Sequence, residues 1–280
     1  MNYQSVVFAG GGSRCFWQAG FYAELAQNRE LAPTQVAAVS AGSAMACLAV
    51  ARRWDRALEE FKRVTAANQR NFYPRRLLSR TATAFPHLDM YRRTILSVMD
   101  DSAFEELKTG ADIHVLLARP PAWIGPRLSA LLAFAGYKLE KRLLGPVHPR
   151  AGQRLGFRPE VVRAQDCAGP EELADLILHS SCTPPFTPLF RRAGRPVLDG
   201  GAVDPVPTLA LGDAPGRTLV LLTARYPRHR IPTTADTTYV QPSAEIPIST
   251  WDYANPDGLQ AAYDLGRRDA EVFRRAAPLS

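Results

Sequence analysis

Cysteine is scarce in this sequence, with four residues scattered over 280 positions. None of them forms a C-x-x-C pair, which is the spacing typical of a structural zinc site. Scattered free thiols are typical of a reducing compartment, so we expect a cytoplasmic protein without a zinc site. The N-terminus lacks a basic segment followed by a long apolar run, so we expect no signal peptide.

Long hydrophobic runs are also missing. Hydrophobic residues make up 46% of the chain, enough for a sizeable core. No stretch approaches the roughly 20 apolar residues that a membrane-spanning helix needs. Zinc-finger spacing and aromatic–basic strand motifs are absent as well, so we expect no nucleic-acid partner.

Lysine is rare, yet the chain is basic. Only four of its 34 basic residues are lysines, and the formal net charge is +7. An arginine bias of this kind is typical of a GC-rich genome. Its functional interpretation is attraction to an anionic partner. Peripheral contact with an anionic membrane surface therefore stays open.

Short apolar, β-branched runs alternate with helical patterns along the chain. This alternation predicts a layered α/β fold with a mostly parallel sheet. The predicted strands cover residues 5–9, 36–39, 113–118, 159–164, 196–199 and 217–224. The predicted helices cover residues 15–27, 43–54, 127–144 and 169–181, with a last one from about residue 256. We interpret residues 1–280 as one domain with a helical insertion or cap at about 68–150.

Three consecutive glycines, Gly10 to Gly12, lie between the first predicted strand and the first helix. Backbone N–H groups at such a turn can approach an anion closely. Dinucleotide binding, an oxyanion hole and a plain tight turn all fit this placement. The dinucleotide fingerprint is incomplete, because Cys15 replaces its third glycine and the second strand ends in Ser40 instead of an acid.

Ser40 closes the second predicted strand and precedes a helix. The stretch AVSAG is close to the nucleophile elbow G-x-S-x-G, with Ala38 at the first glycine position and Gly42 at the second. An elbow would expose the serine hydroxyl on a sharp turn. The alternative is an ordinary N-cap serine without a catalytic role.

Asp199 ends another predicted strand and is followed by Gly200 and Gly201. A strand would hold the carboxylate in a fixed position, and the glycines would leave room for a substrate. The alternative is a plain D-G turn, which is frequent in proteins. We interpret the nearby Asp204 as a structural cap before Pro205.

Taken together and in this order, the three motifs resemble those of the patatin-like phospholipase family, bacterial members in particular. The stretch GGGSRCFWQAG is similar to the glycine-rich oxyanion loop of that family. The resemblance implies this role for Gly10, Gly11, Gly12 and Arg14. Cys15 stands where the family usually has a glycine.

The other motifs of the chain resemble the same family. AVSAGS is similar to its nucleophile elbow and LDGG to its aspartate motif, which implies Ser40 as nucleophile and Asp199 as its catalytic partner. SSCTPPFTPLF resembles the Pro-rich segment that precedes the aspartate. The stretch PISTWDYANPDGLQAAYDLGRRDA resembles the C-terminal tail of bacterial members.

The resemblance implies a three-layer α/β sandwich with helices on both faces of the sheet. It also implies a lipid acyl hydrolase with a Ser–Asp dyad, no metal and no cofactor, acting on phospholipids or other acyl-ester lipids. Two alternatives stay open. One is a soluble carboxylesterase or thioesterase with the same dyad, and the other is a lipid-binding protein whose site has decayed, because Ala38 and Cys15 depart from the family pattern.

Histidine is not expected to take part. Of the five histidines, only His229 follows Asp199 and so fits the Ser–Asp–His chain order of the α/β-hydrolases. It lies in a basic segment typical of a solvated loop. We therefore predict that Asp199 accepts the proton of Ser40 directly.

The helix predicted over Arg127–Leu144 is amphipathic. Its basic residues include Lys138, Lys141 and Arg142, and aromatic residues accompany it. The pattern fits a helix packed on the core, and it also fits a surface helix that meets lipid.

Overall fold

The computed structural model describes residues 3–27, 31–78, 84–143 and 145–276; for residues 77, 78, 134, 137–139 and 141–143 it describes the backbone only. The main sheet has the strand order β4-β3-β2-β1-β8-β9, and β7 pairs with β3. Its strands are β1 (Ser5–Phe8), β2 (Gln35–Val39), β3 (Asp112–Arg119), β4 (Arg158–Arg163), β7 (Leu198–Asp199), β8 (Thr218–Leu221) and β9 (Thr237–Val240). A hairpin of β5 (Arg191–Arg192) and β6 (Arg195–Pro196) stands apart.

The centre of the sheet is parallel. The neighbours β1 and β2, β2 and β3, β1 and β8, and β8 and β9 all pair in parallel, whereas β4 and β7 run antiparallel to β3. The central strands are nearly all apolar because both of their faces are buried. The carboxyl ends of the parallel strands meet at one edge, and ligands of open α/β sheets bind outside such an edge.

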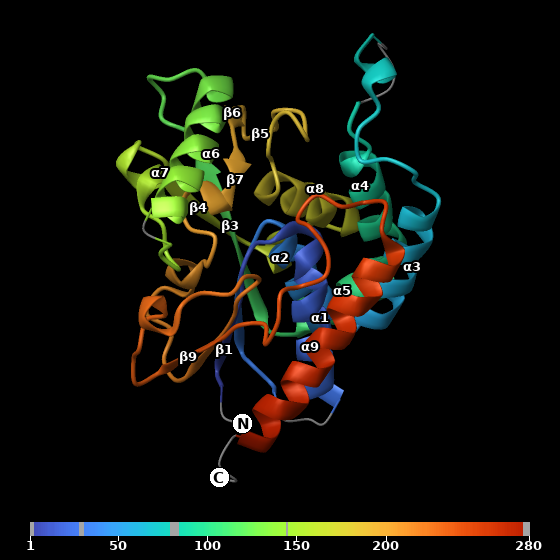
Figure 1. Cartoon of the computed structure of the whole chain (residues 1–280), viewed down its shortest axis with the longest axis vertical. Helices are drawn as coiled ribbons and strands as arrows, with labels where there is room; N and C mark the ends of the chain where they lie inside the picture. The colour runs from blue at the N-terminus through green and yellow to red at the C-terminus, as the bar shows by residue number, and fades with distance from the viewer. Residues whose placement is uncertain (1–2, 28–30, 79–83, 144, 277–280) are drawn as a thin grey trace.

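One face of the sheet packs against the main helical layer, where most of the buried core residues gather. Figure 1 shows α1, α2, α8 and α9 on this side, together with α3, α4 and α5. The helices are α1 (Phe16–Gln27), α2 (Ala41–Val50), α3 (Trp54–Ala66), α4 (His87–Val98), α5 (Asp101–Thr109), α8 (Pro170–Ser180) and α9 (Pro256–Ala276).

The opposite face carries a thinner layer. It consists of α6 (Pro126–Leu143), α7 (Ala151–Arg154) and the short 3₁₀ helices η4 (Gly200–Ala202) and η5 (Thr208–Leu211). Two smaller apolar clusters join these elements to the residues of β1, β2, β3 and β8 that point to this side. The predicted three-layer α/β sandwich with a mostly parallel sheet is therefore confirmed.

The prediction missed several elements. Residues 196–199, predicted as one strand, contain the end of β6 and the whole of β7, and β9 was not predicted. Every residue of β9 is only partly buried, so the strand lacks an apolar run. The interval 68–150, predicted as an insertion or cap, contains β3 together with α4 and α5, whose apolar residues belong to the main core. No helix within the described residues is long and apolar enough to cross a membrane.

Candidate active site

Ser40 stands at a strained turn between β2 and α2. Its φ of 54° and ψ of −136° lie outside the regions that side chains favour. The turn brings Gly42 so close to β1 that a Cβ atom there would lie 2.6 Å from Ala9 O. Although Ser40 occupies the N-cap position, its hydroxyl makes no capping hydrogen bond. The hydroxyl is thus free for another partner, as at a nucleophile elbow.

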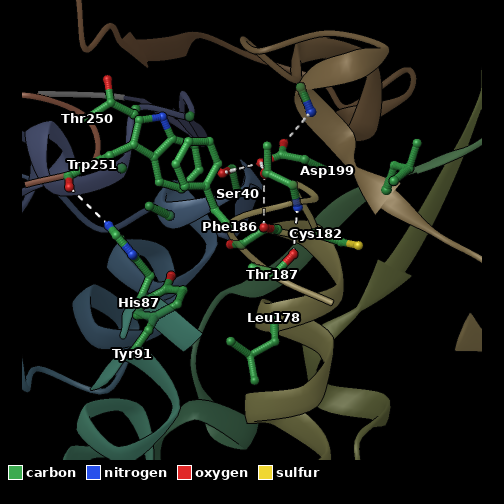
Figure 2. A pocket seen from close by; sticks show the side chains of 18 of the residues that line it. Ser40, His87, Tyr91, Leu178, Cys182, Phe186, Thr187, Asp199, Thr250 and Trp251 are labelled. Carbon is green, nitrogen blue, oxygen red and sulfur yellow. Dashed lines mark hydrogen bonds between the residues drawn. The ribbon is translucent and has the colours of Figure 1, made fainter. Parts of the chain in front are cut away.

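That partner is Asp199. The hydroxyl of Ser40 donates a hydrogen bond to Asp199 Oδ2 at 2.6 Å. The other carboxylate oxygen, Oδ1, accepts the amide of Gly201 at 2.7 Å, and the hydroxyl of Thr183 lies 3.4 Å from Oδ2. Asp199 therefore makes the turn expected of a D-G sequence and also faces Ser40. Figure 2 shows the two side chains pointing toward one another.

Ser180, at the end of α8, supports the elbow from behind. Its hydroxyl accepts the Ser40 amide at 2.8 Å and donates to Leu116 O of β3 at 2.7 Å. The backbone of Asp199 is fixed nearby, because its amide donates to Cys182 O at 2.8 Å. Sequence reasoning assigned no role to Ser180; the only signal was its place as the first residue of the Pro-rich segment that resembles the family.

The surroundings of Asp199 change its acidity. Burial raises the pKa of Asp199 to about 6, while the hydrogen bonds from Ser40, Gly201 and Thr183 lower it and offset part of this effect. The direction follows from the poor solvation of a carboxylate beside an apolar cavity. A carboxylate with this pKa is a stronger base than an ordinary aspartate and is still mostly ionised at neutral pH.

Hydrogen bonds fix the glycine loop at several backbone atoms. The Gly10 amide donates to Pro205 O at 2.9 Å, and Gly10 O accepts the hydroxyl of Thr223. The Ser13 amide donates to Thr250 O at 3.1 Å. Within the described part of the chain, the amides of Gly11 and Gly12 donate no hydrogen bond. These two N–H groups are thus available to a ligand, whereas that of Gly10 is occupied.

Two side chains complete the loop. Arg14 Nε donates to Gly11 O at 3.4 Å. Because a trans peptide directs its C=O and N–H groups to opposite sides, this contact orients the Gly12 N–H away from Arg14. Gly12 itself has a φ of 59°, and a Cβ atom there would overlap Thr250 O. Cys15, which replaces a family glycine, is fully buried with its thiol 3.6 Å from Ala9 O.

A cavity of about 960 Å³ opens in front of Ser40 and Asp199. Its walls come from the glycine loop, α4, α6, α8 and the segments 181–187 and 250–253. Phe186 and Trp251 stack with ring centres 4.5 Å apart, and Figure 2 shows them beside Ser40. Most of the lining side chains are apolar. The cavity therefore suits an extended hydrocarbon group whose carbonyl carbon reaches Ser40.

The histidines lie elsewhere or have other partners. His229 is exposed in a short 3₁₀ helix and does not line the cavity. His87 lines it, but Nε2 of His87 is bound to Trp251 O at 3.0 Å. His148 pairs with the buried carboxylate of Asp204 at 2.8 Å. Asp204 also accepts the amide of Val206 at 2.9 Å, which is the structural role expected for it.

A known protein family matches most of the chain. A family model described as patatin-like phospholipase matches residues 6–211. The chain belongs to this family. Membership supports a lipid acyl hydrolase activity. A crystal structure of VipD from Legionella pneumophila resembles the chain over 97% of this chain and 67% of that one, with 12% identity and a TM-score of 0.47. No curated protein matches the chain.

The patatin-like domain brings all of the sequence-predicted site residues to one cavity. Its lining includes Gly10, Gly11, Gly12, Arg14, Ser40 and Asp199. Within the described residues, no group of three or more His, Cys, Asp or Glu side chains is placed to hold a metal ion.

Proposed function

We propose that this patatin-like protein cleaves ester-linked acyl chains of lipids with Ser40 as nucleophile and Asp199 as general base. The 2.6 Å hydrogen bond between their side chains carries the proposal. It joins a strained elbow to a carboxylate of raised pKa, at the floor of a largely apolar cavity. A nucleophile within hydrogen-bond reach of its base is the arrangement that covalent catalysis requires.

The reaction has two halves. In the first, Ser40 Oγ attacks the ester carbonyl carbon while its proton passes to Asp199 Oδ2. The tetrahedral intermediate then collapses, the C–O bond to the alcohol breaks, and Asp199 returns the proton to the leaving oxygen. In the second half, water attacks the acyl-serine, with Asp199 again taking and returning a proton. The products are a free fatty acid and a lipid alcohol, and the dyad is restored.

The glycine loop supplies the oxyanion donors in this proposal. The amides of Gly11 and Gly12 make no hydrogen bond within the described chain, and both residues line the same cavity as Ser40. Gly10 acts through its hydrogen bond to Pro205, which fixes the start of the loop, and Arg14 acts through Gly11 O. Preorganised donors of this kind are worth roughly 3–4 kcal/mol each in the transition state.

The packing argues against a decayed, purely lipid-binding site. Ala38 lies in the main core without exposed surface, and Cys15 fits beneath the glycine loop. Neither departure from the family pattern interrupts the contact between Ser40 and Asp199. Contact with an anionic membrane surface and a cytoplasmic location stay predictions of the sequence.

Lipid profiling tests the proposal. Mixed phospholipid vesicles are incubated with the wild-type protein and, in parallel, with Ser40→Ala. Free fatty acid and lysolipid should accumulate with the wild type only, and a fluorophosphonate probe should label the wild type only. Labelling without lipid turnover, together with fast cleavage of short soluble esters, would favour a carboxylesterase or thioesterase. Absence of both labelling and turnover would favour a lipid-binding protein.

A further inference from the structure

Large hydrophobic side chains remain exposed near the cavity. The exposed fractions are 41% for Phe72, 78% for Trp123, 52% for Leu128 and 62% for Leu131. Leu128 and Leu131 lie on α6, whose Ala130 and Ala133 line the cavity. Exposed apolar groups that gather at one place mark a site that meets another apolar surface.

Phe72 is connected to the cavity from the opposite side. Its ring packs on Phe85 with centres 5.0 Å apart, and Phe85 packs on Phe186 at 4.9 Å. Phe186 in turn stacks on Trp251 in the cavity wall. A continuous row of aromatic rings therefore leads from the surface to the site.

Three segments lie at the same end of the molecule, and we call them the mouth segments. They are residues 70–76, 119–131 and 189–196. Figure 1 shows the start of α6, the β5–β6 hairpin and the cyan segment before α4 at this end. The mouth segments contain no acidic residue. Their basic residues are Arg70, Arg75, Arg76, Arg119, Arg127, Arg191, Arg192 and Arg195.

Most of this positive charge is exposed. Arg119 and Arg192 are half-buried and pair with Glu160, whereas the other six arginines of the mouth segments are exposed. The nearest exposed acids along the chain are Glu59 of α3 and Asp89 in the first turn of α4, and both lie outside the mouth segments. Apolar side chains interspersed with arginines and almost no carboxylates match a bilayer that carries anionic headgroups.

We propose that the mouth segments dock the protein on an anionic lipid bilayer, with Trp123, Leu128, Leu131 and Phe72 inserted among the headgroups. This inference rests on the proposed function, because docking would place the open cavity against the membrane that holds the ester substrate. Tryptophan is favoured at the depth where headgroups meet acyl chains. The side chains of Lys138, Lys141 and Arg142, candidates for lipid contact in the sequence, lie outside the described residues, and the docking surface named here does not include them.

Vesicle co-sedimentation tests the docking surface. The protein used is Ser40→Ala, so that lipid breakdown does not alter the vesicles. It should bind vesicles of phosphatidylcholine mixed with phosphatidylglycerol far better than phosphatidylcholine alone. In that background, Leu128→Ser/Leu131→Ser should weaken binding at least tenfold. Arg75→Gln, Arg127→Gln and Arg195→Gln should each weaken it about fivefold, equivalent to about 1 kcal/mol per charge.

Two matched controls lie outside the mouth segments. Val272→Ser removes an exposed hydrophobic side chain near the end of α9, at the opposite end of the molecule in Figure 1. Arg228→Gln removes an arginine from the 3₁₀ helix η6 (Arg228–Arg230). Neither change should alter vesicle binding.

Tryptophan emission gives an independent readout. Trp17 and Trp54 are buried and Trp251 is half-buried in the cavity wall, so Trp123 is the most exposed of the four tryptophans. Emission should shift to the blue when anionic vesicles are added, and Trp123→Phe should remove most of that shift. An unchanged shift in Trp123→Phe would overturn the insertion of this residue.

Docking and catalysis can fail separately. In the Ser40-containing protein, the mouth variants should keep normal turnover of a short soluble nitrophenyl ester while hydrolysis of anionic vesicles falls. Equal binding to neutral and anionic vesicles, or no binding, would overturn the docking proposal even if the ester is cleaved. Self-association in light scattering that Leu128→Ser/Leu131→Ser abolishes, without vesicle binding, would assign the surface to a second copy of the chain and also overturn it.

Discussion

The amide of Ser40 is held by the hydroxyl of Ser180, 2.8 Å away and 140 residues later in the chain. The Ser180 hydroxyl in turn donates a hydrogen bond to Leu116 O of β3, which connects the elbow to both α8 and the sheet. The backbone of residue 40 is thus held through its own amide, by a contact that does not depend on the Ser40 side chain. Substitutions of the Ser40 side chain should therefore remove chemistry without dismantling the turn.

Ser40→Ala and Ser40→Gly should both abolish ester hydrolysis and fluorophosphonate labelling. They should differ in stability, because a side chain at a φ of 54° is strained and glycine is not. We expect Ser40→Gly to unfold at a higher temperature than Ser40→Ala, by a difference of about 1 kcal/mol. Thermal unfolding followed by circular dichroism measures this.

The same two substitutions at Ser43, inside α2, serve as the matched control. There the order should reverse, with Ser43→Gly less stable than Ser43→Ala, because glycine is unfavourable inside a helix. Residual labelling of Ser40→Ala at Ser43 or Ser181 would contradict Ser40 as the only covalent nucleophile.

The pH dependence of kcat/KM should report Asp199. An ordinary aspartate base would keep activity down to about pH 4, but burial raises the pKa of Asp199 to about 6. The base must be ionised, so kcat/KM should be level above about pH 7 and fall tenfold per unit below about pH 6. A short soluble ester should be used, so that binding to vesicles does not enter the profile. An acid limb near pH 4 would contradict a poorly solvated carboxylate.

A limb near pH 6 is also what a histidine would give, so variants must separate the two. Asp199→Asn should remove most activity, because an amide cannot accept the serine proton. His229→Ala should leave activity within about twofold, since His229 is exposed and does not line the cavity. Steady-state kinetics on one ester compare the variants. A loss in His229→Ala as large as that in Asp199→Asn, with the fold intact, would favour a Ser–Asp–His triad.

Asp199→Asn should also stay folded. Because the folded pKa is raised above 3.8, protonation of Asp199 stabilises the folded protein at low pH, and this contribution is lost as the pH rises through about 6. The neutral amide avoids that loss. At pH 8, Asp199→Asn should therefore be as stable as the wild type or more stable, by up to about 3 kcal/mol. Its advantage should vanish below about pH 4.

Gly12→Ala tests the oxyanion loop. A Cβ atom at residue 12 would overlap Thr250 O, and a φ of 59° disfavours alanine, so the loop must shift. If the Gly12 amide is a donor, kcat should fall about 10²–10³-fold while KM changes little. Gly125→Ala is the matched control, because a Cβ atom there meets nothing within 4 Å. Equal kcat in both variants would remove Gly12 from the proposed hole.

Ala38→Gly restores the elbow sequence of the family. In the sheet, Ala38 is paired between Phe8 and Val115, with no exposed surface. Turnover should be similar or higher, because removal of the Ala38 methyl group takes away nothing that catalysis needs. Stability should fall by about 1 kcal/mol, since glycine inside a strand loses packing and gains freedom when unfolded. A large loss of kcat in the folded variant would give Ala38 an active packing role.

The sequence predicted the strand ends that carry Ser40 and Asp199 because local patterns mark them. It could not predict Ser180, since a serine that ends a helix becomes a support only when α8 packs beside β2 and β3. The hydrogen bond from the Gly10 amide could not be predicted either, because its acceptor, Pro205 O, lies far along the chain. The acidity of Asp199 depends on burial by the whole cavity wall. Such properties arise from packing between distant segments.

The buried thiols allow opening of the fold to be measured by chemical modification. All four cysteines are buried, and burial raises the pKa of each, so the reactive thiolate is suppressed while the protein is folded. Alkylating reagents would then modify only molecules that have opened. Cys15 lies under the glycine loop, and Cys182 holds the amide of Asp199. The alkylation rates of Cys15 and Cys182 would therefore measure how often the structure opens on each side of the catalytic centre.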